Sequence, residues 1–150
     1  MNWAEEKMHL TEQLEILREL RNRFGEEVIE IASKARLAVH KRWMEELSKD
    51  SPGRPSDVFK HSAFSVTTAG SDILVYDVGE DSTERFSVRI KKCKYADFYR
   101  EEGSPEIGYA MHCALDFGEA EAFGSGISLQ RTKTLMKGDD CCNHCYELKK

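Results

Sequence analysis

The sequence predicts a single domain of the α+β class, with an N-terminal helical hairpin, an antiparallel sheet, a long helix packed on that sheet and a C-terminal β-hairpin. Two observations predict this fold. Apolar residues recur at spacings of three and four over the first 48 residues, and the spacing changes to two after a linker. That linker, within SKDSPGRPSD, has no periodicity and carries two prolines and a glycine. We therefore divide the domain 1–150 into a helical hairpin (1–48), a linker (49–57) and an α+β part (58–150).

Two helices are expected in the hairpin. The first runs from about Leu10 to Phe24, where apolar residues repeat every three or four positions, and Gly25 ends it. The second extends to about Leu47. Its apolar stripe fits packing inside the chain and pairing with a second copy equally well, so a homo-oligomer is one alternative. The stripe consists of Val28, Ile31, Ala32, Ala35, Ala38, Val39, Trp43 and Leu47.

The strands are expected after the linker. AFSVTTAGSDILVYDV predicts two short strands on either side of Ala69-Gly70-Ser71. RFSVRIKKC alternates apolar and polar residues, which is typical of a half-buried strand, and it ends at Cys93. ISLQRTKTLM and CCNHCYEL predict an antiparallel hairpin around residues 137–140.

Two further helices are expected between these strands. KYADFYREEG predicts a short helix closed by Gly103. Ser104 and Pro105 supply an N-cap and a first-turn proline for a long helix that runs to Phe123. This helix lacks the one wide polar face of a surface helix, so its second arc is predicted to face a cleft. That arc carries Glu106, Tyr109, Cys113, Asp116 and Ala120.

Composition excludes several classes of partner. There are 22 Lys and Arg against 27 Asp and Glu, a formal net charge of −5, which does not favour nucleic acid or an anionic membrane. No stretch approaches the roughly 20 apolar residues of a membrane span. The start, MNWAEEKMHL, is charged where a signal peptide would be apolar, so we expect a cytoplasmic protein. Five cysteines, an odd number, then favour free thiols or ligands over a disulfide framework.

The cysteines gather near the end of the chain in CCNHC. In a strand, Cys142 and His144 point to one face, and Cys141 and Cys145 point to the other. This placement allows a thiolate–imidazolium pair for nucleophilic catalysis. Two alternatives stay open: a small buried thiol beside a hydrogen-bonded histidine, or a zinc site that adds Cys93 to Cys142 and His144.

The second half of the chain resembles a known enzyme family. CKYADFYREEGSPEIGYAMHCALD and AFGSGISLQRTKTLMKGDDCCNH are similar to the L-2-amino-thiazoline-4-carboxylic acid hydrolase family over about residues 86–144. The shared features are a strand that ends in cysteine, a Gly-Ser-Pro-Glu helix start, Cys113 with Asp116, an Arg-Thr-x-Thr-Leu strand, and Cys142-Asn143-His144. The helical first half resembles the family only in kind.

The resemblance implies hydrolysis of a cyclic amidine. The family's named substrate is a five-membered ring whose amidine carbon lies between a sulfur and two nitrogens, and the ring bears a carboxylate. Its opening gives N-carbamoyl-L-cysteine on a bacterial route to L-cysteine. The resemblance therefore implies a small-molecule substrate as the partner. We expect the enzyme to use neither a metal nor a cofactor.

Such a reaction needs a nucleophile, an acid and a cation for the substrate carboxylate. Cys142 or Cys113 could attack the amidine carbon, or a carboxylate could activate water. We predict that Asp116 binds the amidinium, that His144 acts as base and later as acid, and that Arg131 clamps the substrate carboxylate. The other predicted substrate-binding residues are Glu106, Tyr109, Thr132 and Thr134.

Two residues depart from the expected family pattern: Asn143 stands where we expect an aspartate, and Cys145 where we expect an arginine. If these positions tune the site, the substrate differs from the family's name. The alternative function is a non-catalytic small-ligand sensor or carrier of the 4-vinyl-reductase-like kind, with or without the zinc site described above.

Overall fold

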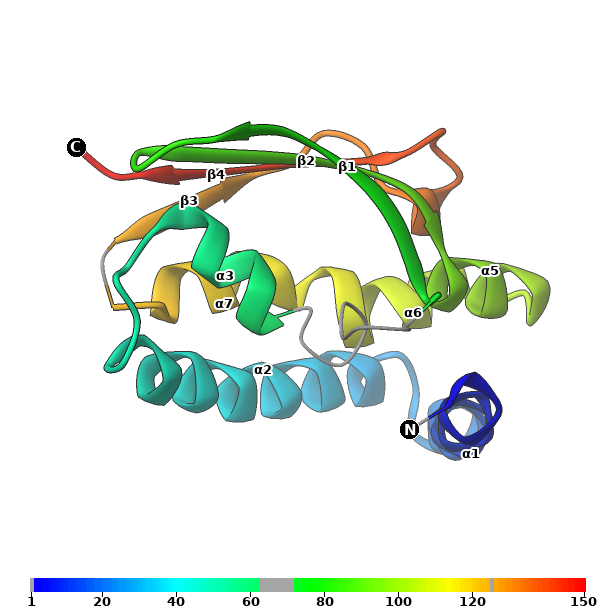
Figure 1. The fold of residues 1–150 in the computed structure, drawn as a ribbon. Coiled ribbons are helices and arrows are strands. Elements are labelled where there is room, and N and C mark those ends of the chain that lie inside the picture. Colours follow the sequence, from blue (N-terminus) through cyan, green and yellow to red (C-terminus); the bar gives the residue numbers. More distant parts are fainter. Residues whose placement is uncertain (1, 63–71, 125) are drawn as a thin grey trace.

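The computed structural model describes residues 2–62, 72–124 and 126–150, which form an α+β fold. Among these residues three helices come first, and the later helices lie between the two halves of the sheet in the chain. The four-stranded antiparallel sheet has the order β1-β2-β4-β3. Three layers are visible in Figure 1: the sheet, the long helix beneath it, and α2 on the far side of that helix. This arrangement confirms the predicted fold class.

The central strands carry the regular part of the core. β2 spans Arg85–Cys93, as predicted, and its alternate residues Phe86, Val88 and Ile90 are buried. β4 spans Cys142–Leu148 and pairs with β2 so that Cys142, His144 and Tyr146 lie opposite those three residues. The outer strands are β1, Leu74–Asp81, beside β2, and β3, Ile127–Gln130, beside β4.

The two predicted N-terminal helices are present. α1 spans Trp3–Phe24 and begins with a capping box between Asn2 and Glu5, and Gly25 follows it with a φ of 90°. α2 spans Glu27–Ser48. In Figure 1 α1 is seen nearly end-on while α2 runs across the view, so the helices cross each other instead of lying along each other.

The predicted long helix contains an irregular turn. It consists of α6, Pro105–Gly108, a π-helical segment, η1, at Tyr109–Cys113, and α7, Leu115–Ala122. The amide of Ala114 donates to the carbonyl of Tyr109, which is the i to i+5 bond of a π turn. Residues after this turn are displaced by one position relative to a regular α-helix. Periodicity alone does not predict such a turn.

Three other elements refine the predictions. α3, Pro55–Ser62, begins inside the segment predicted as linker. α5, Lys94–Glu101, is the predicted short helix, and Gly103 follows it with a φ of 68°. The first of the two strands predicted around Ala69-Gly70-Ser71 lies outside the described residues, whereas the second is β1.

The C-terminal hairpin pairs as predicted, but its first strand is shorter than expected. β3 ends at Gln130, and the chain then turns away and forms a short 3₁₀ helix, η2, at Leu135–Lys137. The Asn143 side chain explains the departure, because its Oδ1 accepts hydrogen bonds from the amides of Thr132 and Lys133 at 3.0 and 2.8 Å. Those amides therefore bind a side chain in place of a neighbouring strand.

Two apolar clusters hold the layers together, one between the sheet, α3 and α7, and the other between α1, α5 and the start of the long helix. None of the helices in the described part of the chain combines the length and apolar character needed to cross a membrane.

The contact between α6 and α5 yields a stability prediction. A Cβ added at Gly108 would lie 2.5 Å from Cγ of the fully buried Tyr99 ring and 2.7 Å from the sulfur of Met136. Because the ring cannot move aside, we expect Gly108→Ala to lower the free energy of unfolding by about 1–3 kcal/mol. Urea denaturation monitored by circular dichroism measures this change.

Gly118→Ala is the matched control, since it also lies in the long helix. Its Cβ would meet the methyl end of Leu37 at 2.6 Å, and a flexible side chain can rotate away. We expect a near-neutral effect, because alanine is favoured over glycine in a helix by about 0.5–1 kcal/mol. Equal losses in both variants would contradict the predicted role of the Gly108 contact.

Candidate functional site

A cavity of about 190 Å³ lies between the sheet and the helices. Its wall is built from α2, the long helix, the ends of β2 and β4, and the segment after β3. Polar side chains converge on it from elements far apart in the sequence. Its charged, imidazole and thiol groups are Arg36, His40, Cys93, His112, Cys113, Asp116, Glu119, Arg131, Cys142 and His144.

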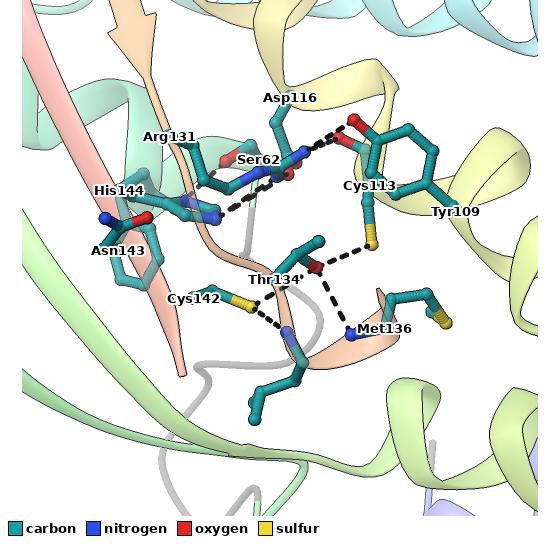
Figure 2. A network of polar contacts seen from close by, with 12 residues as sticks. Ser62, Tyr109, Cys113, Asp116, Arg131, Thr134, Met136, Cys142, Asn143 and His144 are labelled. Atoms are coloured by element: carbon teal, nitrogen blue, oxygen red, sulfur yellow. Dashed lines mark hydrogen bonds and ion pairs between the residues drawn. The ribbon is translucent and has the colours of Figure 1, made fainter. Parts of the chain in front are cut away.

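Arg131 is the centre of the polar network in Figure 2. Its side chain is only 3% exposed, and Nη1 donates to Oδ2 of Asp116 at 2.6 Å. Nη2 donates to the carbonyl of Cys113 at 3.0 Å. The guanidinium also lies against the rings of Phe117 and Tyr109, at 4.9 and 5.7 Å from their centroids. The prediction that Arg131 clamps a substrate carboxylate conflicts with this geometry, because its donors already hold Asp116 and the helix.

Asp116 presents one oxygen to Arg131 and leaves the other available. Among the described residues no group hydrogen-bonds to Oδ1, and the side chain is 24% exposed at the cavity. Burial raises the pKa of Asp116 to about 7, against the opposing attraction of Arg131, and the nearby charge of Glu119 adds to the rise. The carboxyl group can therefore gain and lose a proton near neutral pH.

His144 is buried between Arg131 and Tyr146. Its Nε2 lies 3.4 Å from Nη1 of Arg131, which can only donate, and its Nδ1 lies 3.2 Å from the hydroxyl of Tyr146. These partners assign the proton to Nδ1. Burial, with the charge of Arg131, lowers the pKa of His144 to about 3, so the ring is neutral at physiological pH. The thiolate–imidazolium pair considered for Cys142 and His144 therefore lacks its imidazolium.

The thiols at the cavity are protonated. The Cys142 sulfur accepts a hydrogen bond from the amide of Leu135 at 3.3 Å, and burial nevertheless raises its pKa. Burial also raises the pKa of Cys113 to about 12 and that of Cys93 to about 11. The hydroxyl of Thr134 lies between two of these sulfurs, 3.7 Å from Cys142 and 4.0 Å from Cys113 (Figure 2). None of the three has the lowered pKa of a reactive cysteine.

Neither a disulfide nor a metal cluster is formed by these cysteines. All five are free thiols in the structure. In the ranges 2–62, 72–124 and 126–150, no group of three or more His, Cys, Asp or Glu side chains is arranged to hold a metal ion. The zinc site of Cys93, Cys142 and His144 is therefore not assembled in the described structure.

Five of the predicted site residues line the cavity: Cys113, Asp116, Arg131, Cys142 and His144. The other four do not. Glu106 is exposed and paired with Arg21 at 3.1 Å, and Thr132 is exposed and bonded to Asn143. Tyr109 lies against Arg131 and Lys137, and Thr134 is buried behind the thiols.

The contribution of α2 to the cavity was not predicted from the sequence. Arg36 and His40, four residues apart, point to the cavity from one face of this helix. His40 Nδ1 lies 2.5 Å from Oε1 of Glu119, which is buried on α7. An arginine and a histidine four residues apart inside an otherwise apolar stripe were the available signal, but such residues more often face solvent.

The comparison with protein families covers nearly the whole chain. Residues 5–146 match the sequence profile described as L-2-amino-thiazoline-4-carboxylic acid hydrolase. The match therefore extends well beyond the 86–144 region on which the resemblance was based, and it includes the helices that supply Arg36 and His40. No curated protein sequence matches the chain.

Solved structures share the fold at low sequence identity. A trafficking protein particle complex subunit 3 from Naegleria fowleri, covalently bound to palmitic acid, is 13% identical with a TM-score of 0.51, covering 98% of this chain and 96% of that one. The phenol-responsive sensory domain of the transcription activator PoxR, with phenol, is 14% identical with a TM-score of 0.52, covering 89% of this chain and 71% of that one.

The ion pair at the cavity yields a second prediction. We expect Arg131→Met to lower the free energy of unfolding by about 3–5 kcal/mol near pH 8, because it leaves the Asp116 carboxylate buried without its partner. Removing the cation raises the pKa of Asp116 further above its unfolded-chain value. A carboxyl group with a raised folded pKa favours the folded state at low pH and loses that contribution as pH rises. The loss should therefore be smaller near pH 5, as urea denaturation at both pH values can measure.

Arg85→Met is the matched control. Arg85 is half exposed and pairs with Glu147 at 3.1 Å at the surface of the sheet. An exposed pair contributes no more than about 1 kcal/mol. A loss of this small size in Arg131→Met at about pH 8 would show that Asp116 does not depend on the arginine.

Proposed function

Because this chain belongs to the L-2-amino-thiazoline-4-carboxylic acid hydrolase family, we propose that it hydrolyses a small carboxylated cyclic amidine of that type, with N-carbamoyl-L-cysteine as the product. The observation that carries the proposal is the Asp116 side chain, which is anchored at one oxygen by Arg131 and has its other oxygen unpaired at a cavity.

The size of the cavity supports a small substrate. Sites for drug-sized ligands usually measure about 300–1,000 Å³. The cavity of about 190 Å³ is smaller and suits a single five-membered ring with short substituents. Its wall combines apolar and aromatic side chains with the few charged groups described above, as small-molecule sites commonly do.

Asp116 is the proposed general base. A base works best when its pKa lies near the operating pH, and the pKa of Asp116 is raised to about 7. Its ionised form takes a proton from water as the water oxygen bonds to the amidine carbon. Arg131 holds the carboxylate in place during this step and remains charged throughout.

The remaining step breaks the bond between the former amidine carbon and the ring sulfur. The electron pair of that bond goes to sulfur, which takes the proton that Asp116 accepted from water. The attacking oxygen becomes the carbonyl oxygen and gives its second proton to solvent, because the protonated amidine already carries a hydrogen on its ring nitrogen. The ring opens to a carbamoyl group and a free thiol, so one water is consumed and no oxidant or reductant is required. The neutral His144 keeps the Asp116–Arg131 pair in a low-dielectric surrounding and does not carry the proton.

A thiolate nucleophile is not part of this proposal. Cys113 and Cys142 both have raised pKa values, and the neutral His144 has its two nitrogens beside Arg131 and Tyr146. Neither thiol has the adjacent base that activates a nucleophilic cysteine. Their contribution is to fill space beside the cavity as small apolar groups.

The alternative is a non-catalytic carrier or sensor of a small ligand. Two proteins of this fold are described with small molecules, palmitic acid in one and phenol in the other. The absence of an activated thiol in the described part of the chain is compatible with this alternative. Measured turnover of a cyclic amidine would distinguish a hydrolase from such a carrier or sensor.

The first functional prediction concerns Asp116→Asn. The amide keeps the shape of the side chain and an oxygen for Arg131, but it cannot take a proton. We expect the kcat for L-2-amino-thiazoline-4-carboxylic acid to fall by about 100- to 10,000-fold, as is typical for loss of a general base. Formation of the free thiol product, followed with a thiol reagent, measures the rate.

Cys142→Ser and Cys113→Ser are control variants that test whether a thiol is the nucleophile. If water is the nucleophile, both should retain kcat within about tenfold of the unmodified protein. Loss of activity in either serine variant with full activity in Asp116→Asn would reverse the assignment. A folded, pure protein with no turnover at all would favour the carrier.

The second functional prediction concerns pH. The base must be ionised to accept a proton, so kcat/KM should rise with pH and level off above about 7, the raised pKa of Asp116. Initial rates from acidic to mildly alkaline buffers measure this profile. A rate that is already at its plateau near the ordinary aspartate pKa of about 4 would contradict the assignment of Asp116 as the base.

A further inference from the structure

Arg36 is the charged residue in the cavity wall for which the described structure gives no ion pair. It extends from α2, and its Nε is buried without a hydrogen-bond partner among the described residues. Each of the two carboxylates in the wall is already matched, Asp116 with Arg131 at 2.6 Å and Glu119 with His40 at 2.5 Å.

Among the described residues, no carboxylate forms an ion pair with Arg36. Glu6 lies near the wall through Tyr95, whose hydroxyl donates to it at 2.6 Å, but it makes no ion pair with the arginine. The residues between Ser62 and Asp72 include no acidic side chain. A buried N–H without a hydrogen-bond partner is unfavourable unless something else pairs with it.

The charge of Arg36 acts on a histidine and two tyrosines. Burial, with the charge of Arg36, lowers the pKa of His112 to about 3, and His112 Nε2 lies 3.0 Å from the hydroxyl of Tyr99. Tyr95 and Tyr99 also lie close enough for its charge to oppose the burial that raises their pKa values. Arg36 extends from α2 and Asp116 from α7, so the two groups reach the cavity from different helices.

We propose that Arg36 binds the carboxylate of the substrate and selects acidic cyclic amidines over uncharged ones. This inference rests on the proposed function, since it uses the cavity in which Asp116 acts. A guanidinium offers parallel N–H donors to the two oxygens of a carboxylate, and Nε is one of the donors in that fork. The substrate would lie with its carboxylate toward α2 and its amidine toward α7.

The test compares two compounds that differ in one group: L-2-amino-thiazoline-4-carboxylic acid and 2-amino-thiazoline, which lacks the carboxylate. Arg36→Met removes the charge and keeps much of the length of the side chain. We expect kcat/KM for the acid to fall roughly 10- to 100-fold, the size expected for one charged hydrogen-bonded contact. The change should appear mainly in KM, and kcat/KM for the uncharged compound should stay within about twofold.

Two further variants complete the experiment. Arg42→Met, at an exposed position on the same helix, should leave both reactions unchanged. Arg36→Lys keeps the positive charge but lacks the two parallel N–H donors of a guanidinium. It should therefore retain part of the preference for the acid that Arg36→Met loses. Because Arg36→Met removes an unpaired buried donor, its melting temperature should equal or exceed that of the unmodified protein, which verifies that the variant folds.

Equal loss on both compounds, or no loss on either, would overturn the inference while leaving the hydrolase intact. If the unmodified protein turns over neither compound, the proposed function fails, and the same variants are compared by calorimetric binding of the acid. Binding that weakens in Arg36→Met and not in Arg42→Met would still support the anion site. Binding that does not depend on the carboxylate would overturn it.

Discussion

The buried ion pair between Arg131 and Asp116 is the interaction on which the rest of the site depends. It joins the segment after β3 to α7 across the boundary between the sheet and the helical layer. Removing two charges from water is costly, and this pair is supported by further contacts: the Cys113 carbonyl, the rings of Phe117 and Tyr109, and a histidine that stays neutral. Each of those contacts is to the arginine, so the arginine is fixed and the carboxylate keeps one oxygen unpaired. The asymmetry makes Asp116 available for chemistry.

Local irregularities bring the two partners together. A regular strand through residue 136 would place alternate side chains on opposite faces, and Arg131 and Thr134 could not both point inward. Asn143 ends the strand by taking the amides of Thr132 and Lys133. On the other side, the π turn at Tyr109–Cys113 shifts the residues that follow it, and the Ser33 hydroxyl donates to the Ala110 carbonyl of that turn at 2.6 Å. The position at which an aspartate was expected thus has a structural role as asparagine.

Features that depend on local periodicity could be predicted from the sequence. Features that depend on contacts between elements were harder to predict. β2 and the start of the long helix follow from alternation and from Ser104-Pro105. The convergence of Cys113, Asp116, Arg131, Cys142 and His144 on one cavity was predicted through the family resemblance. A residue's role depends on partners that the sequence does not show: Arg131 has the right chemistry for a substrate carboxylate, but in the structure its Nη1 donates to Asp116. Arg36 and His40 were missed because helix periodicity does not show that the long helix separates α2 from the sheet and leaves a cavity between them.

The distribution of charge in the cavity matches the distribution of charge in the proposed substrate. A carboxylated cyclic amidine in its protonated form carries a cation at one end and an anion at the other. The wall has the complementary order, with the unpaired oxygen of Asp116 on α7 and the unpaired guanidinium of Arg36 on α2. Glu119 is held by a different partner, since Nδ1 of His40 lies 2.5 Å from its Oε1. In a small cavity, one unpaired acceptor and one unpaired cation fix both the position and the direction of such a ring, because reversing it would bring like charges together. The amidine carbon is then held beside the group that activates water, so binding specificity and the geometry of the reaction come from the same two charges.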